Sequence, residues 1–281
     1  MWIETAWRPF RTVLDSLAAV LLPSDCRICN QPLVRLSRIP VCNGCLNSLA
    51  PADVNACSVC GEALEFTIAE VSPLCGICRR ALPRFDFAIS FASYDGALRR
   101  LVHLLKYEQL RPAARVLGAK LAHVISRADF AEDQAVLVTP VPLHRSKRRQ
   151  RGFNQAELIA RGALRHLDAS RFVLHTGNLR RTQATVSQTG LTSHQRRENV
   201  RGAFALRSPE QVRGRSVVLI DDVYTTGTTL NECARMLRAA GANEIVVATV
   251  ARVYRQAAHI AVGGVSTQEE NATAVSGAVA G

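Results

Sequence analysis

Aromatic side chains are scarce in this chain, where Phe, Trp and Tyr together make up 5% of 281 residues. Proteins that hold single-stranded nucleic acid by base stacking need such rings, so the chain offers few stacking platforms. Acidic side chains are also outnumbered, because 35 Lys and Arg oppose 23 Asp and Glu and give a formal net charge of +12. This excess favours a polyanionic partner, either nucleic acid or a phosphorylated ligand, provided that the arginines cluster and are not simply spread over the surface.

Long apolar runs are absent too, since no stretch reaches the roughly 20 residues that a membrane-spanning helix needs. The nearest candidate, Ser16–Leu22, is short, follows Glu4 and Asp15, and has no small-residue cleavage site after it. These features argue against a secretory signal and against membrane insertion, and they predict a cytoplasmic protein. Residues 1–22 are predicted to form an amphipathic helix that packs on the protein, and residues 259–281 to form a disordered tail.

Eight of the nine cysteines form four Cys-x-x-Cys pairs in the first third of the chain. Two such pairs present four thiolates to one ion, which is the shell that structural zinc prefers, so four pairs predict two zinc sites. A shell of four thiolates leaves no position open for water, so these sites are structural and not catalytic. The predicted ligands are Cys26, Cys29, Cys42, Cys45, Cys57, Cys60, Cys75 and Cys78.

The spacing leaves the pairing of these cysteines open. Sequential pairing closes the shortest loops, and interleaved pairing is the alternative. Disulfides would need an oxidising compartment, and four redox pairs in so short a segment would be unusual. We expect residues 23–82 to form a small module that depends on its metals for stability, and we expect the ninth cysteine, Cys233, to lie in the core.

From Pro83 onward, apolar runs alternate with helical patterns. Strands are predicted at residues 85–94, 135–143, 171–179, 215–223 and 244–253, with helices between them. Apolar strands without polar alternation are buried on both faces, and alternation of strands with helices is typical of a parallel, doubly wound sheet. Residues 83–258 are therefore predicted to form one α/β domain.

One stretch of this domain, Val217–Leu230 (VVLIDDVYTTGTTL), joins an apolar strand to two acids and a threonine-rich loop. Ligands bind at the carboxyl ends of parallel strands, where Asp221 and Asp222 are expected to lie. Gly227 and four threonines around the start of a helix near Thr228 would bind a phosphate through backbone N–H groups, hydroxyls and the helix dipole. The acids would repel that phosphate, so vicinal sugar hydroxyls or a metal ion suit them better. The pattern thus outlines a ribose 5-phosphate.

Two simpler interpretations of this stretch are weaker. An apolar strand that ends in acids is also found in ATPases, but the chain has no Gly-x-x-x-x-Gly-Lys-Ser/Thr phosphate loop. A threonine-rich helix cap does not explain two adjacent acids at the end of a buried strand, where each carboxylate loses solvation. The stretch resembles instead the motif that binds 5-phosphoribosyl 1-diphosphate (PRPP) in type I phosphoribosyltransferases.

With the paired cysteines, three further segments are similar to the ComF family: Leu101–Tyr107, Thr139–Arg161 and Leu179–Phe204. The resemblance runs from Cys26 to Val253 and implies a double zinc-ribbon-like module followed by a type I phosphoribosyltransferase fold. It also implies that Mg²⁺-bound PRPP is the ligand. It further implies that incoming single-stranded DNA is handled in the cytoplasm during natural competence, beside a helicase partner.

The resemblance assigns roles to residues by position. The catalytic residues would be Asp221, Asp222, Arg148 and Arg151. The PRPP-binding set would be Asp221, Asp222, Val223, Tyr224, Thr225, Thr226, Gly227, Thr228 and Thr229. A pyrophosphate loop would hold Arg145, Arg148, Arg151 and Gly152, for which a merely solvated basic loop is the alternative. Single-stranded DNA is expected to contact Arg145, Lys147, Arg148, Arg149, Arg180, Arg181, Arg196 and Arg197.

Three other features are placed near this site. Residues 182–202 are polar and occupy the position of the family's mobile catalytic loop. Lys106 is expected to face the site from the preceding helix. His144 is either a structural histidine or a proton carrier.

Three functions are consistent with these features. In the first, the fold binds PRPP and the basic segments hold single-stranded DNA. In the second, the protein is an active phosphoribosyltransferase, although no residues indicate a pocket for a purine or pyrimidine acceptor. In the third, it is a PRPP-sensing regulator that binds RNA, and only the basic charge supports this interpretation.

Overall fold

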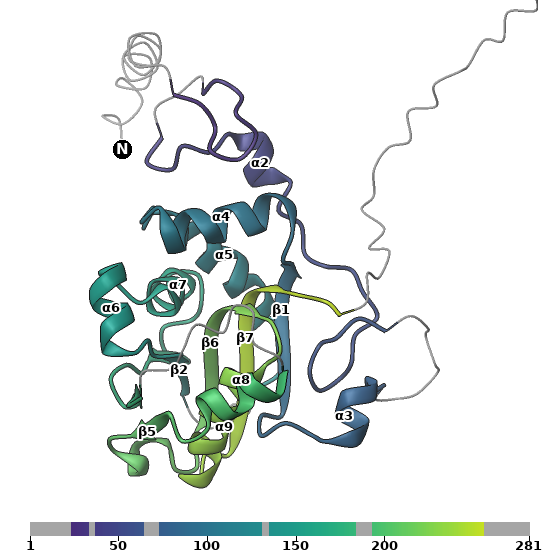
Figure 1. Cartoon of the computed structure of the whole chain (residues 1–281), viewed down its shortest axis with the longest axis vertical. Helices are drawn as coiled ribbons and strands as arrows, with labels where there is room; N and C mark the ends of the chain where they lie inside the picture. Colours follow the sequence, from purple (N-terminus) through teal and green to yellow (C-terminus); the bar gives the residue numbers. More distant parts are fainter. Residues whose placement is uncertain (1–23, 34–36, 65–72, 131–134, 184–192, 256–281) are drawn as a thin grey trace, which may run out of the picture.

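The computed structural model describes residues 24–33, 37–64, 73–130, 135–183 and 193–255 (Figure 1). Within these ranges five parallel strands form one sheet, which confirms the predicted α/β fold class. The predicted helix at residues 1–22 and the predicted tail lie outside the described residues. In order across the sheet, the strands are β1 (Phe87–Ser93), β7 (Glu244–Arg252), β6 (Ser216–Tyr224), β2 (Val136–Pro140) and β3 (Phe172–Leu174).

Helices cover both faces of the sheet, so the strands are buried on each side as their apolar sequences predict (Figure 1). Neighbouring residues of β6 alternate between two cores, with Val218 in one and Leu219 in the other. The sheet is therefore doubly wound. One core is covered by α4 (Gly96–Tyr107), α5 (Ala113–Ile125) and α7 (Gln155–Ala163), and the other by α9 (Thr228–Ala239). Cys233 is fully buried in the second core, as predicted.

Helices α5 and α7 cross with almost no space between their backbones. A Cβ atom at Gly118 would lie 2.5 Å from backbone atoms of Gly162 and Ala163, so only glycine fits there. The contact fixes α7, whose first residue follows Asn154. The Asn154 side chain donates a hydrogen bond to the Val141 carbonyl at 2.9 Å, just beyond the carboxyl end of β2. This packing holds the start of α7 beside the carboxyl end of β2, at the edge of the sheet where ligands bind.

The two cysteine-rich knuckles share buried cores with the α/β body. The first knuckle contains the short helix α2 (Asn43–Asn47), and its buried residues belong to the same core as those of α4 and α5. The second contains α3 (Gly76–Arg80) and packs into the core beneath α9. The segment between them follows the edge strand β1, where the Ala52 N–H donates to the Phe91 carbonyl at 2.8 Å. The domain boundary at residues 82 and 83 stays a prediction.

The basic segment after β2 was expected to be a loop, and that prediction is wrong because the segment is a helix, α6 (Arg145–Arg151). The His144 side chain caps its first turn by accepting a hydrogen bond from the Ser146 N–H at 3.3 Å. Gly152 ends the helix in a left-handed conformation with φ 77°. These two caps explain how a run of polar and mostly basic residues becomes helical.

Strand β6 agrees with the predicted strand at residues 215–223 and runs through both acids to Tyr224. Its carboxyl-terminal part is paired with β7, with Asp221 beside Thr249 and Tyr224 beside Arg252. Successive side chains of a strand point to opposite faces, so the two acids diverge instead of lying together in a loop.

The predicted strand at residues 171–179 is shorter than expected and leads into a second sheet. The chain turns after β3, where the Asn178 side chain accepts a hydrogen bond from the Ser208 N–H at 2.8 Å. Part of the predicted mobile loop is helical, and its residues 184–192 lie outside the described ranges. The remaining elements are the antiparallel ribbon of β4 (Leu179–Arg181) and β5 (Phe204–Leu206), helix α8 (Ser193–Val200) and the 3-10 helix η1 (Pro209–Val212).

Candidate functional site

The two acids lie at the carboxyl end of β6. Asp222 is 4% exposed, and its Oδ1 atom forms an ion pair with the Lys106 Nζ atom of α4 at 2.8 Å. Its second oxygen, Oδ2, is buried and has no hydrogen-bond partner. An unpaired carboxylate oxygen inside a protein is costly, so this atom indicates a missing donor or cation. Lys106 faces the site as the sequence predicts.

The charge of the acids depends on their surroundings. Burial, and then the charge of Asp222, raises the pKa of Asp221 to about 7, although Lys106 and Arg181 work in the opposite direction. Burial disfavours the ammonium form of Lys106, but the charge and hydrogen bond of Asp222 outweigh it and raise the pKa of Lys106. The Asp221 carboxyl therefore changes its charge near neutral pH. A ligand that brings a cation or hydroxyl donors to it would favour the ionised form.

The loop from Thr225 to Thr229 joins β6 to α9. Gly227 adopts φ 72° at the start of the helix, and no side chain caps this end of α9. The hydroxyl oxygens of Thr226 and Thr228 lie 2.8 Å apart at the same turn. An uncapped helix N-terminus with hydroxyl donors beside it is suited to bind a phosphate group. A Cβ atom at Gly227 would collide with the Tyr224 hydroxyl, so the loop rests directly on that ring.

Cationic side chains from three elements interact near the acids: Lys106 of α4 and Arg181 of β4 act on Asp221, and both also act on Lys147 of α6. Burial lowers the pKa of Lys147 in α6, and the charges of Arg181, Arg151 and Lys106 lower it further. Burial also lowers the pKa of Arg181, while the charges of Cys233 and Asp221 oppose this effect. The cations that lower the pKa of Lys147 repel its ammonium form, and a ligand with several negative charges relieves that repulsion. The acids and cations together therefore suit a phosphorylated sugar whose other end carries a diphosphate.

A cleft of about 630 Å³ lies beside this cluster, between α6 and the β4–β5 ribbon. Arg145 and Arg148 line it from α6, and Arg180 and Arg181 line it from β4. Guanidinium groups donate in pairs to phosphate oxygens, so this arginine cleft is suited to a phosphodiester backbone. Because Arg181 borders the cleft and also interacts with Asp221, the cleft and the acid site adjoin.

Other predicted site residues take different positions. Arg151 donates a hydrogen bond to the Gln155 Oε1 atom at 2.7 Å, and its guanidinium lies 5.6 Å from the centre of the Tyr107 ring. It does not line the arginine cleft, and neither does Arg149. The Tyr224 side chain is buried beneath the phosphate loop.

The other predicted residues lie on α8 and at the start of α6. Arg196 and Arg197 belong to α8, but their side chains lie outside the described part of the chain. His144 lines the cleft and caps α6, which favours its structural interpretation.

The sequence interpretation missed two contributions. Lys147 was assigned to DNA, but the charges that lower its pKa include those of Lys106 and Arg181, which also act on Asp221. Its position four residues before Arg151 would have indicated a shared helix face, had the segment been predicted as a helix. Glu232 of α9 accepts a hydrogen bond from the Gly202 N–H at 2.8 Å and thus holds the end of the predicted mobile loop. No sequence signal distinguishes Glu232 from an ordinary helix-surface acid.

The eight paired cysteines form two clusters, and in each cluster the four sulfur atoms lie within 4.8 Å of one another. Three of the sulfur pairs are 3.9, 3.6 and 3.5 Å apart. A tetrahedral zinc ion with Zn–S bonds of about 2.3 Å would place its sulfurs about 3.8 Å apart, so both clusters fit such an ion. The pairing is sequential: the first cluster takes Cys26, Cys29, Cys42 and Cys45, and the second takes Cys57, Cys60, Cys75 and Cys78.

The chain is similar to known proteins over most of its length. A model of the phosphoribosyl transferase domain matches residues 153–278, which include the acids and the phosphate loop. Competence protein F of Haemophilus influenzae is 31% identical over 224 residues, which cover 78% of this chain and 93% of that protein. The chain belongs to the ComF family. Two further similar proteins are the DNA utilization protein YhgH of Escherichia coli O157:H7 (31% identical, 80% and 96% covered) and competence protein ComFC of Bacillus subtilis (26% identical, 67% and 80% covered).

Membership of the ComF family confirms the predicted resemblance and the phosphoribosyltransferase fold. Among the helices of the described ranges, none is long and apolar enough to cross a membrane. The cytoplasmic location stays a prediction.

Proposed function

We propose that this protein binds Mg²⁺-PRPP at the carboxyl end of β6 and holds single-stranded DNA in the adjoining arginine cleft during DNA uptake or utilization. The observation that carries the proposal is the buried, unpaired Oδ2 atom of Asp222 beside an uncapped helix N-terminus and a cluster of cations. The names of the related proteins, which refer to competence and DNA utilization, support the DNA part.

Each part of PRPP has a matching set of side chains. The ribose hydroxyls and Mg²⁺ suit Asp221 and Asp222, because carboxylates accept hydrogen bonds and ligate hard cations. The 5-phosphate suits the uncapped start of α9, where backbone N–H groups and threonine hydroxyls converge. The diphosphate suits the cations Lys147 and Arg181, whose charges otherwise repel.

The diphosphate contact gives the first prediction. Calorimetry at constant Mg²⁺ should show PRPP binding about tenfold or more tightly than ribose 5-phosphate, because only PRPP carries the diphosphate that the cations attract. Lys147→Met should weaken PRPP binding and leave ribose 5-phosphate almost unaffected. The matched control is Arg149→Gln on the same helix, which should change neither affinity because Arg149 is exposed and its charge is not among those that act on Lys147 or Asp221. Equal affinities for the two ligands, or binding of neither, would contradict the site assignment.

The arginine cleft gives the second prediction. A protein that neutralises phosphates with cationic side chains loses affinity with salt, and each contact to a single strand adds about 0.7 to the slope of log K against log salt. Arg145→Gln combined with Arg148→Gln should therefore reduce the slope by about 1.4 and weaken binding of a single-stranded oligonucleotide. Fluorescence anisotropy over a salt series measures both. An unchanged slope in the double variant, or an equal loss in Arg149→Gln, would refute this cleft as the DNA site.

Transfer of the ribosyl group is a second candidate function, favoured by the position of Arg181 between the acid site and the cleft. An acceptor nitrogen in the cleft would form a bond to C1 as the C1–oxygen bond breaks and pyrophosphate leaves with its electron pair, and the proton that the nitrogen loses would pass to solvent. The cations would stabilise the negative charge of that leaving group. Release of pyrophosphate that depends on an added base or amine would establish catalysis, and PRPP binding without release would leave the binding function alone.

We also infer that Zn²⁺ occupies both cysteine clusters and has a structural role. Four thiolates without an open position match structural zinc, and cysteine sulfur does not suit Mg²⁺.

A further inference from the structure

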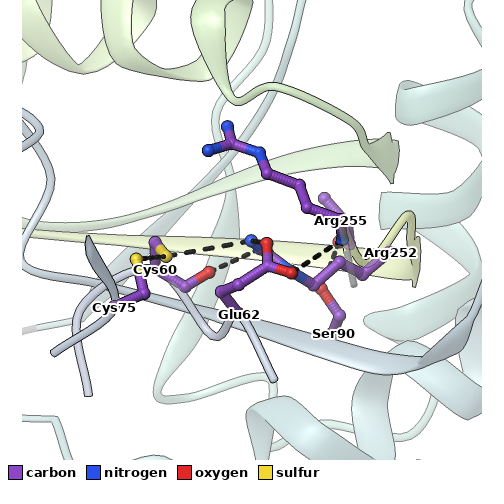
Figure 2. A network of polar contacts seen from close by, with 7 residues as sticks. Cys60, Glu62, Cys75, Ser90, Arg252 and Arg255 are labelled. Atoms are coloured by element: carbon purple, nitrogen blue, oxygen red, sulfur yellow. Dashed lines mark hydrogen bonds and ion pairs between the residues drawn. The ribbon is translucent and has the colours of Figure 1, made fainter. Parts of the chain in front are cut away.

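Arg252, the last residue of β7, is 2% exposed and is one of the largest fully buried side chains in the described ranges. Figure 2 shows its guanidinium among groups of the second knuckle. The Nη1 atom donates to the Cys60 carbonyl, and Nη2 donates to the Glu62 Oε2 atom at 2.8 Å. Nη2 also lies 3.8 Å from the Cys60 sulfur, which is a predicted metal ligand. A buried guanidinium persists only where partners offset its lost hydration, and these partners belong to the second knuckle.

The same guanidinium stacks on Tyr224 of β6, with its carbon 4.1 Å from the ring centre. The ring is also held by Phe85, which packs against it edge to face. Burial raises the pKa of Tyr224 to about 12, so the hydroxyl is neutral at physiological pH. Because Gly227 leaves no room for a Cβ atom above this hydroxyl, the phosphate loop rests on Tyr224, and Tyr224 rests on Arg252.

Backbone contacts reinforce this arrangement. Tyr224 and Arg252 are register partners in neighbouring parallel strands, and the Val253 N–H donates to the Tyr224 carbonyl at 2.9 Å. Glu62 accepts a second hydrogen bond from the Arg255 N–H at 2.8 Å (Figure 2). The second knuckle therefore contacts the end of β7 directly and the end of β6 through Arg252 and Tyr224. These are the carboxyl ends of the strands, where the ligand site lies.

The first knuckle makes a comparable arginine contact at a different place. The Arg100 Nε atom of α4 donates to the Arg27 carbonyl at 2.9 Å, and Arg100 also pairs with Glu108. These contacts join the first knuckle to α4. Arg100 is therefore a matched control for Arg252, because each arginine joins one knuckle to the α/β body.

We propose that Arg252 and Tyr224 are positioning residues through which the metal-bound second knuckle holds the phosphate loop in its phosphate-binding shape. A metal ion with four thiolates carries a net negative charge, which Arg252 complements at Cys60. Loss of that metal removes the bonds that shape the knuckle, and with them the partners of Arg252. Tyr224 then loses its support, and the loop loses its shape. That the loop binds a phosphate rests on the proposed function, but the coupling between the second knuckle and the loop does not.

Hydrogen exchange of the full-length, metal-loaded protein tests the coupling without any ligand. In Arg252→Lys the backbone amides of residues 224–231 should exchange about tenfold faster, because an ammonium cannot serve Cys60, Glu62 and the Tyr224 ring at once. Arg100→Lys should leave these amides unchanged. Glu62→Gln is a milder variant in case Arg252→Lys does not fold, and it should accelerate exchange in the same direction by about threefold. Circular dichroism and metal analysis report whether each variant is folded and loaded.

The affinity for Mg²⁺-PRPP, measured in parallel, separates the two proposals. We expect a loss of about tenfold in Arg252→Lys and none in Arg100→Lys. If the wild-type protein binds PRPP and neither loop exchange nor affinity changes in folded Arg252→Lys and Glu62→Gln, the coupling is refuted while the proposed function stands. If the loop exchanges faster in these variants but the wild-type protein does not bind PRPP, the coupling is supported and the proposed function is refuted.

Discussion

Asp221→Asn and Asp222→Asn should each weaken Mg²⁺-PRPP binding by about 100-fold or more, and the double substitution should abolish it. An amide cannot replace the negative charge that Mg²⁺ needs, and it accepts fewer hydrogen bonds from ribose hydroxyls. Both substitutions should leave the metal content unchanged, because both cysteine clusters lie elsewhere. An unaltered PRPP affinity in the double variant would overturn the assignment of the acids.

The two substitutions should move the free energy of unfolding in opposite directions, which separates lost binding from lost folding. Asp222→Asn deprives the Lys106 ammonium, whose side chain is 17% exposed, of its ion-pair partner and should destabilise the fold by about 3 kcal/mol. Asp221→Asn removes a carboxyl that the fold keeps protonated up to about pH 7. It should therefore stabilise the protein at pH 8.

The sign for Asp221 follows from its pKa, which is about 7 in the folded protein against an ordinary value of 3.8 for a free aspartate. Between these two pH values the folded state binds more protons than the unfolded state, so this group lowers stability as the pH rises through this window. At pH 8 ionisation of Asp221 lowers the free energy of unfolding of the wild-type protein in full, and it has no counterpart in Asp221→Asn. The variant should therefore be more stable than the wild-type protein by about 1 to 3 kcal/mol at this pH. Below pH 4 the gain should vanish. Urea unfolding at pH 8 and pH 4 measures both values, and a pH-independent difference would contradict the assigned pKa.

Local sequence patterns were enough to predict the parts of the site that consist of neighbouring residues. The Cys-x-x-Cys pairs predicted two clusters because each pair is complete within four residues. The apolar strand and threonine loop predicted the edge of the sheet, because a single strand-to-helix turn brings the acids and the uncapped helix end together. Lys106 was predicted as well, from the helix that precedes the site.

Contacts between distant segments could not be predicted in the same way. Arg252 ends an apolar strand and would pass for an exposed cation, but its partner Cys60 lies 192 residues away in the sequence. The divergence of the two acids depends on pairing of β6 with β7 beyond Ile220, which no local pattern encodes. The arginine cleft needs α6 to be a helix, and the caps that make it one outweigh the repulsion expected along a basic segment.

The second metal cluster should contribute far more to stability than the first. All four of its cysteines are buried, and they share a core with Leu219 of β6 and Leu237 of α9. In the first cluster only Cys26 is buried, and Cys29 is exposed. Metal binding in such clusters supplies on the order of 10 kcal/mol of folding free energy, comparable with the whole stability of a domain. Removing the ion of the second cluster should therefore expose apolar surface of the α/β body as well as of the second knuckle.

Cys57→Ser should reduce the zinc content from two ions to one and lower the unfolding temperature by about 10 to 20 °C, which corresponds to about 5 kcal/mol for a chain of this size. The loss also leaves the Arg252 guanidinium short of partners in a buried place, which adds to the effect of the lost ion. Cys29→Ser should remove one zinc ion too, but it should lower the unfolding temperature much less. The first knuckle is more exposed, so it can unfold locally while the core of the sheet stays folded. Metal analysis and calorimetric unfolding of the two variants measure this contrast. Equal losses of stability in the two variants would show that the second cluster contributes no more to the stability of the α/β body than the first.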